Sequence, residues 1–215
     1  IPRTLQMSLL TIRPMSILED APQNRLPVKT YVCQENDGLI KEVISRELAR
    51  DGQVYFLHNR IDTIYSVAGK LKKMFPNITV GVAHGSMDAN QISDVMNDFY
   101  DKKIEILVST SIIESGLDVP NVNTIIVEDS QNFGLAQLYQ IKGRVGRSNR
   151  LAYAYLLYRD YDRISDEGRK RLKALKDFTE LGSGYKIAQQ DLAIRGSGNI
   201  LGSEQAGFVD SLGYE

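Results

Sequence analysis

The sequence contains one cysteine, no tryptophan and no apolar run near the roughly 20 residues that a membrane-spanning helix needs. The single cysteine excludes an internal disulfide. Cys33 stands in an alternating apolar run, residues 28–33, which favours a buried strand thiol over a reactive one. Apolar residues make up 42% and charged residues 25% of the chain, which is typical of a globular domain. The composition therefore predicts a soluble protein without a membrane partner.

Two catalytic motifs of nucleoside triphosphatases are also missing. The sequence has no Gly-x-x-x-x-Gly-Lys-Ser/Thr phosphate loop, and no Asp-Glu-x-His or Asp-Glu-x-Gln carboxylate pair for Mg²⁺. Its first residues, Ile1-Pro2-Arg3-Thr4, lack an initiator Met and a basic, apolar leader. We therefore expect the chain to be a piece of a longer protein.

The net charge of −1 is unevenly distributed along the chain. Residues 139–176 contain eleven Lys and Arg against four Asp and Glu, a local net charge of +7 that leaves −8 for the rest. Such a segment suits a phosphate-facing surface or a solvated helix face. The sequence alone leaves both interpretations open.

Apolar periodicity predicts a parallel sheet covered on both faces. Short apolar runs that indicate strands occur at residues 28–34, 54–57, 78–83, 104–108, 124–127 and 152–157. Most of them are separated by helical patterns, and Asp88 with Gln91 resembles a capping box at the start of one helix. Strands that alternate with helices predict an α/β fold. In such sheets, functional groups lie in loops beyond the carboxyl ends of the strands.

We expect three segments along the chain. Residues 1–27 carry prolines at positions 2, 14, 22 and 27 and read as an extended connector. Residues 28–158 form the α/β core. Residues 159–215 form an appendage, which begins as a helix and ends in a tail containing several glycines.

The strongest local signal is Gln-x-x-Gly-Arg-x-Gly-Arg at residues 140–147. Arg144 and Arg147 are three residues apart and would share one helical face, while Gly143 would let a ligand approach the backbone closely. Guanidinium groups match phosphate oxygens and stay charged. The pattern favours arginine fingers that stabilise phosphoryl transfer in a neighbouring lobe, with a structural arginine pair as the alternative.

A second signal, residues 109–120, follows an apolar strand directly. The hydroxyls of Ser109 and Thr110 could hold a phosphate at the strand end. Asp118, two residues after Gly116, could accept a hydrogen bond from a ribose hydroxyl. A turn with a satisfied aspartate is the alternative.

A third signal, His84-Gly85-Ser86, joins a strand to a helix whose amino terminus attracts anions. Ser86 or the Gly85 amide is therefore a candidate phosphate contact. His84 at such a position more often anchors the loop.

The order and spacing of these three strings resemble the second RecA-like lobe of superfamily 2 helicases. Residues 84–85 take the place of motif IVa, residues 109–120 that of motif V, and residues 140–147 that of motif VI. The resemblance implies a RecA-like parallel sheet flanked by helices. One departure is Lys142, where Arg is more usual, because lysine keeps the charge but loses the planar fork.

The resemblance also implies roles for the residues of these motifs. ATP and Mg²⁺ would be bound mainly by a first lobe outside this chain, so that the chain alone would hold neither and would not hydrolyse ATP. The implied sites are catalytic Gln140, Arg144 and Arg147; nucleotide-binding Gly116, Asp118 and Gly143; DNA-binding His84, Gly85, Ser86, Ser109 and Thr110; and no metal ligands.

The flanking segments narrow the resemblance to the RecG-like branch. Residues 1–5, 133–138 and 191–207 resemble segments of that branch, and residues 7–16 and 24–32 resemble its members that couple transcription to repair. The resemblance implies that residues 159–215 are a translocation motif, a helical hairpin plus loop, in which Arg195 and Gln205 couple lobe closure to movement. For the parent protein it implies a cytoplasmic, ATP-dependent translocase on double-stranded DNA, with RNA polymerase and an excision-repair protein as partners.

Three alternatives stay open. A RecG-like fork-remodelling helicase shares the motor and the loop but not the amino-terminal segments. A Rossmann-type cofactor-binding enzyme needs a glycine-rich turn after its first strand, and residues 34–38 do not form one. A non-catalytic DNA-binding module would bind DNA equally well with and without ATP.

Overall fold

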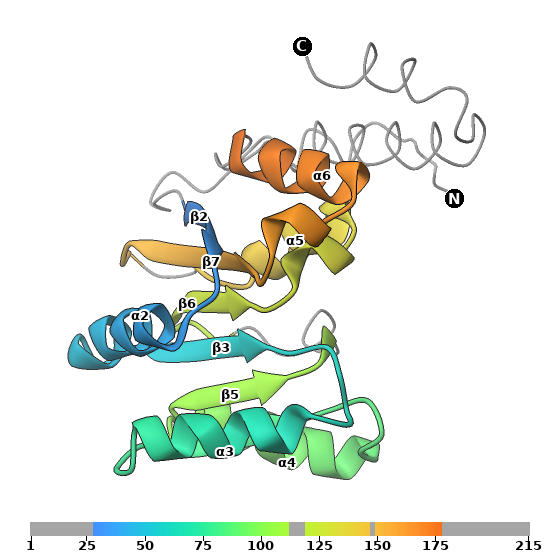
Figure 1. Ribbon diagram of the computed structural model, residues 1–215. Helices are drawn as coiled ribbons and strands as arrows, with labels where there is room; N and C mark the ends of the chain where they lie inside the picture. The colour runs from blue at the N-terminus through green and yellow to red at the C-terminus, as the bar shows by residue number, and fades with distance from the viewer. Residues whose placement is uncertain (1–27, 112–118, 147–148, 178–215) are drawn as a thin grey trace, which may run out of the picture.

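A computed structural model describes residues 28–111, 119–146 and 149–177 of the chain. Strands and helices alternate along it (Figure 1). The elements are β2 (Val28–Gln34), α2 (Asp37–Ala49), β3 (Gln53–Leu57), α3 (Ile64–Met74), β4 (Val80–Ala83), α4 (Ala89–Tyr100), β5 (Ile106–Ser109), β6 (Val122–Val127), η2 (Ser130–Asn132), α5 (Leu135–Lys142), β7 (Ala152–Tyr158), η3 (Tyr161–Arg163) and α6 (Asp166–Asp177).

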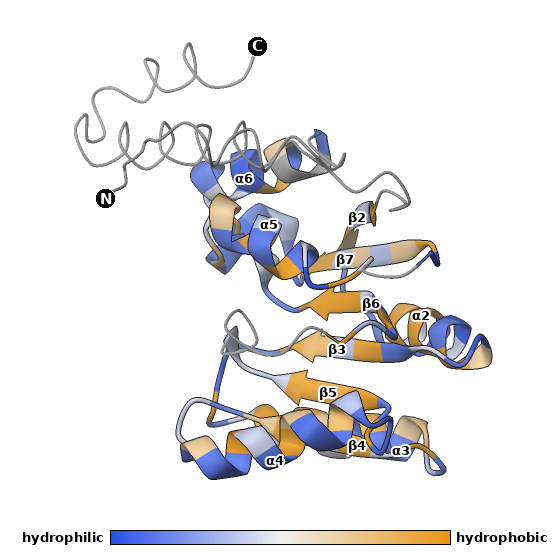
Figure 2. Cartoon of the chain, turned by 180° about the vertical axis from the view of Figure 1, so that it is seen from behind, coloured by the Kyte–Doolittle hydropathy of each residue, from blue (hydrophilic) through white to orange (hydrophobic). Residues whose placement is uncertain are grey.

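The six strands form one sheet in the order β2-β7-β6-β3-β5-β4, and every neighbouring pair is parallel. Helices α2 and α3 pack on one face, and α4, α5 and α6 pack on the other. Figure 2 shows apolar strands between helices that carry hydrophilic residues. The predicted parallel α/β sheet, covered on both faces, is confirmed.

The centre of the sheet is apolar on both faces because side chains alternate along each strand. Tyr55 of β3 belongs to the core cluster on the α4 face, whereas its neighbour Phe56 belongs to the cluster on the α2 face. Each fully buried side chain of this size contributes roughly 1.5–3 kcal/mol of transfer free energy. Because both faces of the strands are buried, the strand sequences are apolar without interruption.

Polar side chains define where several helices begin. The Asn36 side chain caps α2 by accepting from the Leu39 N–H at 2.7 Å. The predicted capping box is confirmed at α4, where Asp88 accepts from the Gln91 N–H and the Gln91 side chain accepts from the Asp88 N–H. Thr63 precedes α3 but makes no capping hydrogen bond to the described residues of that helix. Its hydroxyl bonds elsewhere, as described below.

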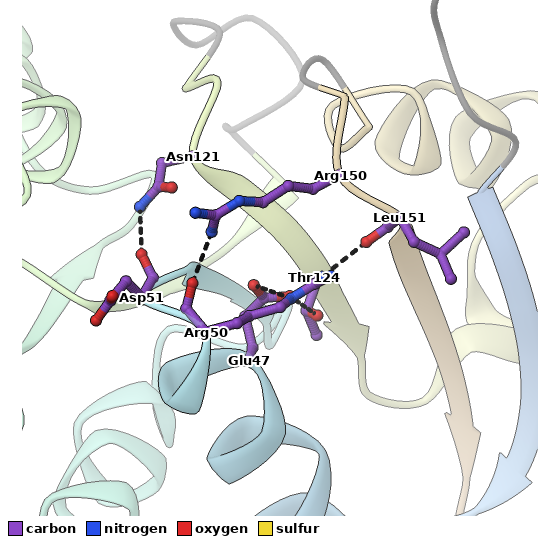
Figure 3. Close-up of polar contacts among 7 residues, drawn as sticks. All are labelled: Glu47, Arg50, Asp51, Asn121, Thr124, Arg150 and Leu151. Carbon is purple, nitrogen blue, oxygen red and sulfur yellow. Dashed lines mark hydrogen bonds and ion pairs between the residues drawn. The ribbon is translucent and has the colours of Figure 1, made fainter.

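A buried carboxylate fixes the end of α2 against the sheet (Figure 3). Glu47 is almost fully buried and accepts from Arg50 Nε at 2.8 Å, from Arg50 Nη2 at 2.6 Å, and from the Thr124 hydroxyl. A Cβ at Gly52 would lie 1.7 Å from Glu47 Oε2. Position 52 therefore requires glycine, because any side chain would displace this carboxylate.

The same network joins segments that are far apart in the sequence (Figure 3). Arg50 Nη2 donates to the Leu151 carbonyl at 2.7 Å, and Arg150 Nη1 donates to the Arg50 carbonyl at 2.7 Å. Asn121 Nδ2 donates to the Asp51 carbonyl at 3.0 Å. The end of α2 is thus tied to the starts of β6 and β7, at the amino edge of the sheet.

Two details differ from the sequence expectations. Cys33 is only partly buried, because β2 is an edge strand and its neighbour Tyr31 on the same face is also exposed. The apolar spacing between the strands at 54–57 and 78–83 predicts a helix face that begins with Ile61, but Ile61 lies outside α3 and is exposed.

The expected terminal segments are largely outside the described residues. Residues 1–27 and 178–215 are not described, so the connector and most of the appendage stay predictions. Residues 159–177, which contain η3 and α6, are the part of the appendage that the structure places, and α6 packs against η2, α5 and β2. Within the described residues, no helix combines the length and apolarity needed to cross a bilayer.

Candidate functional site

Four polar residues form a row at the carboxyl edge of the sheet. Glu128, His58, Thr110 and His84 directly follow β6, β3, β5 and β4, and backbone hydrogen bonds extend the ladders to the first three. Each is two residues beyond a side chain packed on the α2 face, so all four lie on that face. All are buried, with exposed fractions between 3% and 9%. We call them the carboxyl-edge row.

His58 links the row to the start of α3. Its Nδ1 lies 2.7 Å from Glu128 Oε1, and its Nε2 lies 2.7 Å from Thr63 Oγ1. Hydrogen bonds, chiefly from His58, outweigh the burial of Glu128 and lower its pKa. The ionised carboxylate can only accept, so His58 Nδ1 donates to it. In the neutral ring Nε2 then accepts from the Thr63 hydroxyl, which explains why Thr63 does not cap α3.

A second carboxyl group extends this cluster. Burial and a hydrogen bond with Glu128 raise the pKa of Glu35 to about 8. Glu35 is therefore mostly protonated at pH 7 and shares its proton with the ionised Glu128. Arg159, the residue after β7, forms a 3.5 Å ion pair with Asp129 beside the two carboxyl groups.

His84 anchors the loop that sequence analysis predicts as a DNA contact. Its Nδ1 accepts from the Ser86 N–H at 3.2 Å, and its Nε2 lies 3.0 Å from the Tyr65 hydroxyl. Both ring nitrogens are thus engaged within the protein, which favours the loop-anchoring alternative for this side chain. Gly85 and the Ser86 side chain remain exposed.

The helix after this loop attracts anions less than its position suggests. The Asp88 carboxylate already occupies the amino terminus of α4 through the capping box. A phosphate there would compete with a fixed negative charge. Contacts from the exposed Gly85 and Ser86 are therefore more consistent with the structure than an anion seated on α4 itself.

The two hydroxyls at the carboxyl end of β5 differ in whether they are free to bind a ligand. Ser109 is buried and its hydroxyl donates to the Thr110 carbonyl at 2.7 Å, so its placement gives no support to a phosphate contact. Thr110 Oγ1 is buried and has no hydrogen-bond partner among the described residues. An unsatisfied buried hydroxyl calls for an explanation, and a ligand at this edge would supply one.

The Gln-x-x-Gly-Arg-x-Gly-Arg string begins on α5 and continues beyond its end. Gln140 is exposed, Gly143 is the C-cap, and Arg144 is partly buried. Gly146 has a φ of 78°, a left-handed backbone that glycine adopts without strain.

Lys142 of the same string is buried, and burial lowers its pKa to about 8. At pH 7, about one unit below this pKa, Lys142 is still mostly charged, as the sequence analysis expects. Because the Lys142 side chain is buried, it is poorly placed to contact a ligand that is held by another lobe.

The described residues bring the predicted DNA contacts together but leave several sites unplaced. His84, Gly85, Ser86, Ser109 and Thr110 lie at or just after the carboxyl ends of the neighbouring strands β4 and β5. Five predicted residues lie outside the described part of the chain: Gly116, Asp118, Arg147, Arg195 and Gln205.

Sequence analysis missed His58, Thr63, Tyr65, Glu35 and Glu128. His58, Glu35 and Glu128 directly follow the apolar runs 54–57, 28–34 and 124–127, which is the same signal that singled out His84. Thr63 and Tyr65 carry no local motif, because their importance depends on which side chains the fold brings to them.

The described residues fit part of a nucleotide site. The Arg144 guanidinium has the right charge and geometry for a phosphate, and exposed Gln140 lies one turn before it. No group of three or more His, Cys, Asp or Glu side chains within the described residues could hold a metal ion. A Mg²⁺ ion would therefore need ligands beyond these residues.

Comparisons with known proteins agree with this arrangement. The family described as helicase conserved C-terminal domain matches residues 35–149. A transcription-repair-coupling factor of Bacillus subtilis (strain 168) is 54% identical over all 215 residues, and one of Staphylococcus haemolyticus is 50% identical over the same length. The chain spans 18% of the length of these relatives.

Solved structures show the same architecture. RecG bound to a three-way DNA junction is 33% identical, with a TM-score of 0.72 over 84% of this chain and 24% of RecG. Saccharomyces cerevisiae Dbp5 bound to RNA and ADP BeF3 is 19% identical, with a TM-score of 0.54 over 74% of this chain and 42% of Dbp5. The second likeness shows the fold alone, that of a RecA-like helicase lobe.

Proposed function

Because the chain belongs to the helicase conserved C-terminal domain family, we propose that it is the second RecA-like motor lobe of an ATP-dependent double-stranded DNA translocase. In the full-length protein that this implies, the motor displaces stalled RNA polymerase and couples transcription to nucleotide excision repair. The observation that carries the proposal is the similarity to a transcription-repair-coupling factor, which is 54% identical over all 215 residues of the chain. RNA polymerase and an excision-repair protein are the proposed partners outside this lobe.

The carboxyl edge supports a contact with DNA. Exposed Gly85 and Ser86 lie beside the buried Thr110, whose hydroxyl lacks a partner among the described residues. Amides and hydroxyls bind phosphate oxygens without reading the bases. A motor that moves along DNA of any sequence needs contacts of this kind.

The end of α5 supports a contribution to ATP hydrolysis across the cleft between two lobes. We assign Arg144, Arg147 and Gln140 to stabilising the charge that develops on the transferred phosphoryl group, and Gly143, Gly116 and Asp118 to binding the nucleotide. Bound Mg²⁺ would neutralise phosphate charge, and a first lobe would supply its ligands and the phosphate-gripping lysine. This lobe would supply positive charge that keeps its protonation at any physiological pH.

In this proposal the chain has the three segments that the sequence predicts. Residues 28–158 are the motor lobe, residues 1–27 connect it to the first lobe, and residues 159–215 are the translocation motif. In that motif, Arg195 and Gln205 would couple lobe closure to a step along the duplex.

One comparison tests the proposal directly. The isolated chain should show no ATP turnover above buffer and at most weak, salt-sensitive duplex binding. The full-length protein should hydrolyse ATP faster with duplex DNA and should remove a stalled RNA polymerase. Robust turnover by the isolated chain, or a full-length protein indifferent to duplex DNA, would refute the proposal.

A RecG-like fork-remodelling motor is the second candidate, and the TM-score of 0.72 to RecG on a DNA junction favours it. The full-length protein separates the two. Fork regression without displacement of stalled polymerase would support this candidate, and the reverse would support the first.

A further inference from the structure

One exposed aromatic residue at the carboxyl edge has no role in the motifs described above. Tyr65, in the first turn of α3, is 58% exposed. Its ring meets the His84 ring edge-on with centroids 5.6 Å apart, and its hydroxyl lies 3.0 Å from His84 Nε2. The side chain is thus held in one orientation although most of it faces solvent.

The hydrogen-bond pattern fixes the direction of the Tyr65 hydroxyl proton. The Ser86 N–H donates to His84 Nδ1, so that nitrogen carries a lone pair and the neutral ring carries its proton on Nε2. Nε2 therefore donates to the Tyr65 oxygen. The Tyr65 O–H proton points away from His84 and finds no acceptor among the described residues.

The neighbouring histidine has the opposite arrangement. His58 donates through Nδ1 to Glu128, and in the neutral ring its Nε2 accepts the Thr63 hydroxyl proton. The two hydroxyls at the start of α3 are therefore set differently: Thr63 donates inward and Tyr65 donates outward. A donor that faces solvent and is oriented by a buried group is preorganised for an acceptor ligand.

The surroundings of the Tyr65 hydroxyl match a DNA backbone. Gly85 beside it has open space, with the Ile61 side chain 3.9 Å from where a Cβ would lie. The nearby charges of Arg60 and Asp62 form an exposed ion pair and largely cancel. Hydroxyl and amide donors bind a phosphate oxygen without forming an ion pair, which suits a phosphate that must be released at every step.

We infer that Tyr65 is a DNA-contact residue whose hydroxyl donates to a phosphate oxygen of duplex DNA, and that His84 is the positioning residue that orients it. This inference rests on the proposed function and extends it to α3, which none of the sequence motifs includes. It also gives His84 a role in DNA binding that needs no direct contact.

The test uses the full-length protein, a mixed-sequence blunt duplex, and the duplex concentration that gives half-maximal ATPase stimulation. Tyr65→Phe keeps the ring and removes the hydroxyl, and should raise this concentration about three- to tenfold, the effect of losing a typical hydrogen bond at a solvent-exposed position. The maximal rate should stay within about twofold. The dependence of binding on salt should keep its slope, because a neutral donor releases no counterion.

Tyr100→Phe is the matched control. Tyr100 is 54% exposed but lies at the end of α4, near the opposite edge of the sheet, and its variant should behave as wild type. An equal effect of both variants, or a Tyr65→Phe protein identical to wild type, would overturn the inference and leave the proposed function intact. A wild-type protein without duplex stimulation would overturn the proposed function, and the inference with it.

A double-mutant cycle tests the positioning role. His84→Asn retains an oxygen near Nδ1 for the Ser86 N–H but removes the donor to Tyr65. In that background Tyr65→Phe should cost no more than about twofold, since residues that act as a unit are not additive. A full three- to tenfold loss in the His84→Asn background would show that Tyr65 acts without His84.

Discussion

Replacement of Thr110 by valine separates a ligand-binding hydroxyl from a structural one. Valine has nearly the same shape, so the change removes one buried hydroxyl that has no partner among the described residues. Leaving such a group unpaired costs roughly 1–3 kcal/mol in proteins. We therefore expect the free energy of unfolding to stay within about 0.5 kcal/mol of wild type, or to rise by about 1 kcal/mol.

Although Thr110→Val should leave stability unchanged or slightly higher, it should weaken the response to DNA. A lost hydrogen bond to a DNA phosphate would cost about 1.5–3 kcal/mol, so the duplex concentration for half-maximal ATPase of the full-length protein should rise about tenfold or more. Urea unfolding of the chain measures stability, and duplex-stimulated ATPase measures function.

Thr30 offers a matched control for this prediction. It is buried and its Oγ1 also lacks a partner among the described residues, but it lies on β2, on the face opposite the carboxyl-edge row. Thr30→Val should reproduce the small stability change without altering the response to DNA. A loss of more than about 1 kcal/mol in Thr110→Val, or an unchanged response to DNA, would refute the reasoning.

Three further predictions follow from the same structure. Arg50→Met leaves the Glu47 carboxylate buried without its cation, and should lower the free energy of unfolding by about 2–4 kcal/mol, somewhat below a fully buried pair because Arg50 is partly exposed; a loss under about 0.5 kcal/mol in urea unfolding would contradict this. The raised pKa of Glu35, about 8, means that the folded chain binds the extra proton, so stability should fall as pH rises from about 4.5 to 8. Glu35→Gln should flatten that part of the urea-midpoint profile, and an unchanged profile would exclude Glu35 as its source. Arg144→Ala in the full-length protein should slow ATP hydrolysis by roughly 10³ to 10⁵ with an unchanged melting temperature, whereas a rate within a few-fold of wild type would show that Arg144 is not a finger.

Much of the fold follows from local pattern. Each predicted strand appears within a few residues of its expected bounds, because a strand buried on both faces must be apolar throughout. The Asp88 capping box is likewise a local device and could be recognised from two residues. Strand order is not local: nothing in the residues around Val28 indicates that β2 pairs with β7, the last strand of the described residues.

The candidate site was less predictable for the same reason. His84 and Ser109 stand in similar sequence contexts, yet the structure anchors the first to Tyr65 and turns the second inward to the Thr110 carbonyl. The link between Glu35 and Glu128 depends on two strands that are separated by β7 in the sheet. Side-chain direction and non-local pairing therefore decide which members of a motif can meet a ligand.

The pairing of β2 with β7 also has a mechanical consequence. The described chain enters the sheet at Val28, at the amino end of β2, and leaves it at Tyr158, at the carboxyl end of β7, and the two strands pair in parallel along their whole length. A pull between these points loads every hydrogen bond of the ladder in shear at once, since parallel ladders space their bonds evenly. Antiparallel neighbours pulled from one end would instead open one bond at a time. The lobe can thus carry tension from entry to exit without peeling at its edge, as the proposed motor would require.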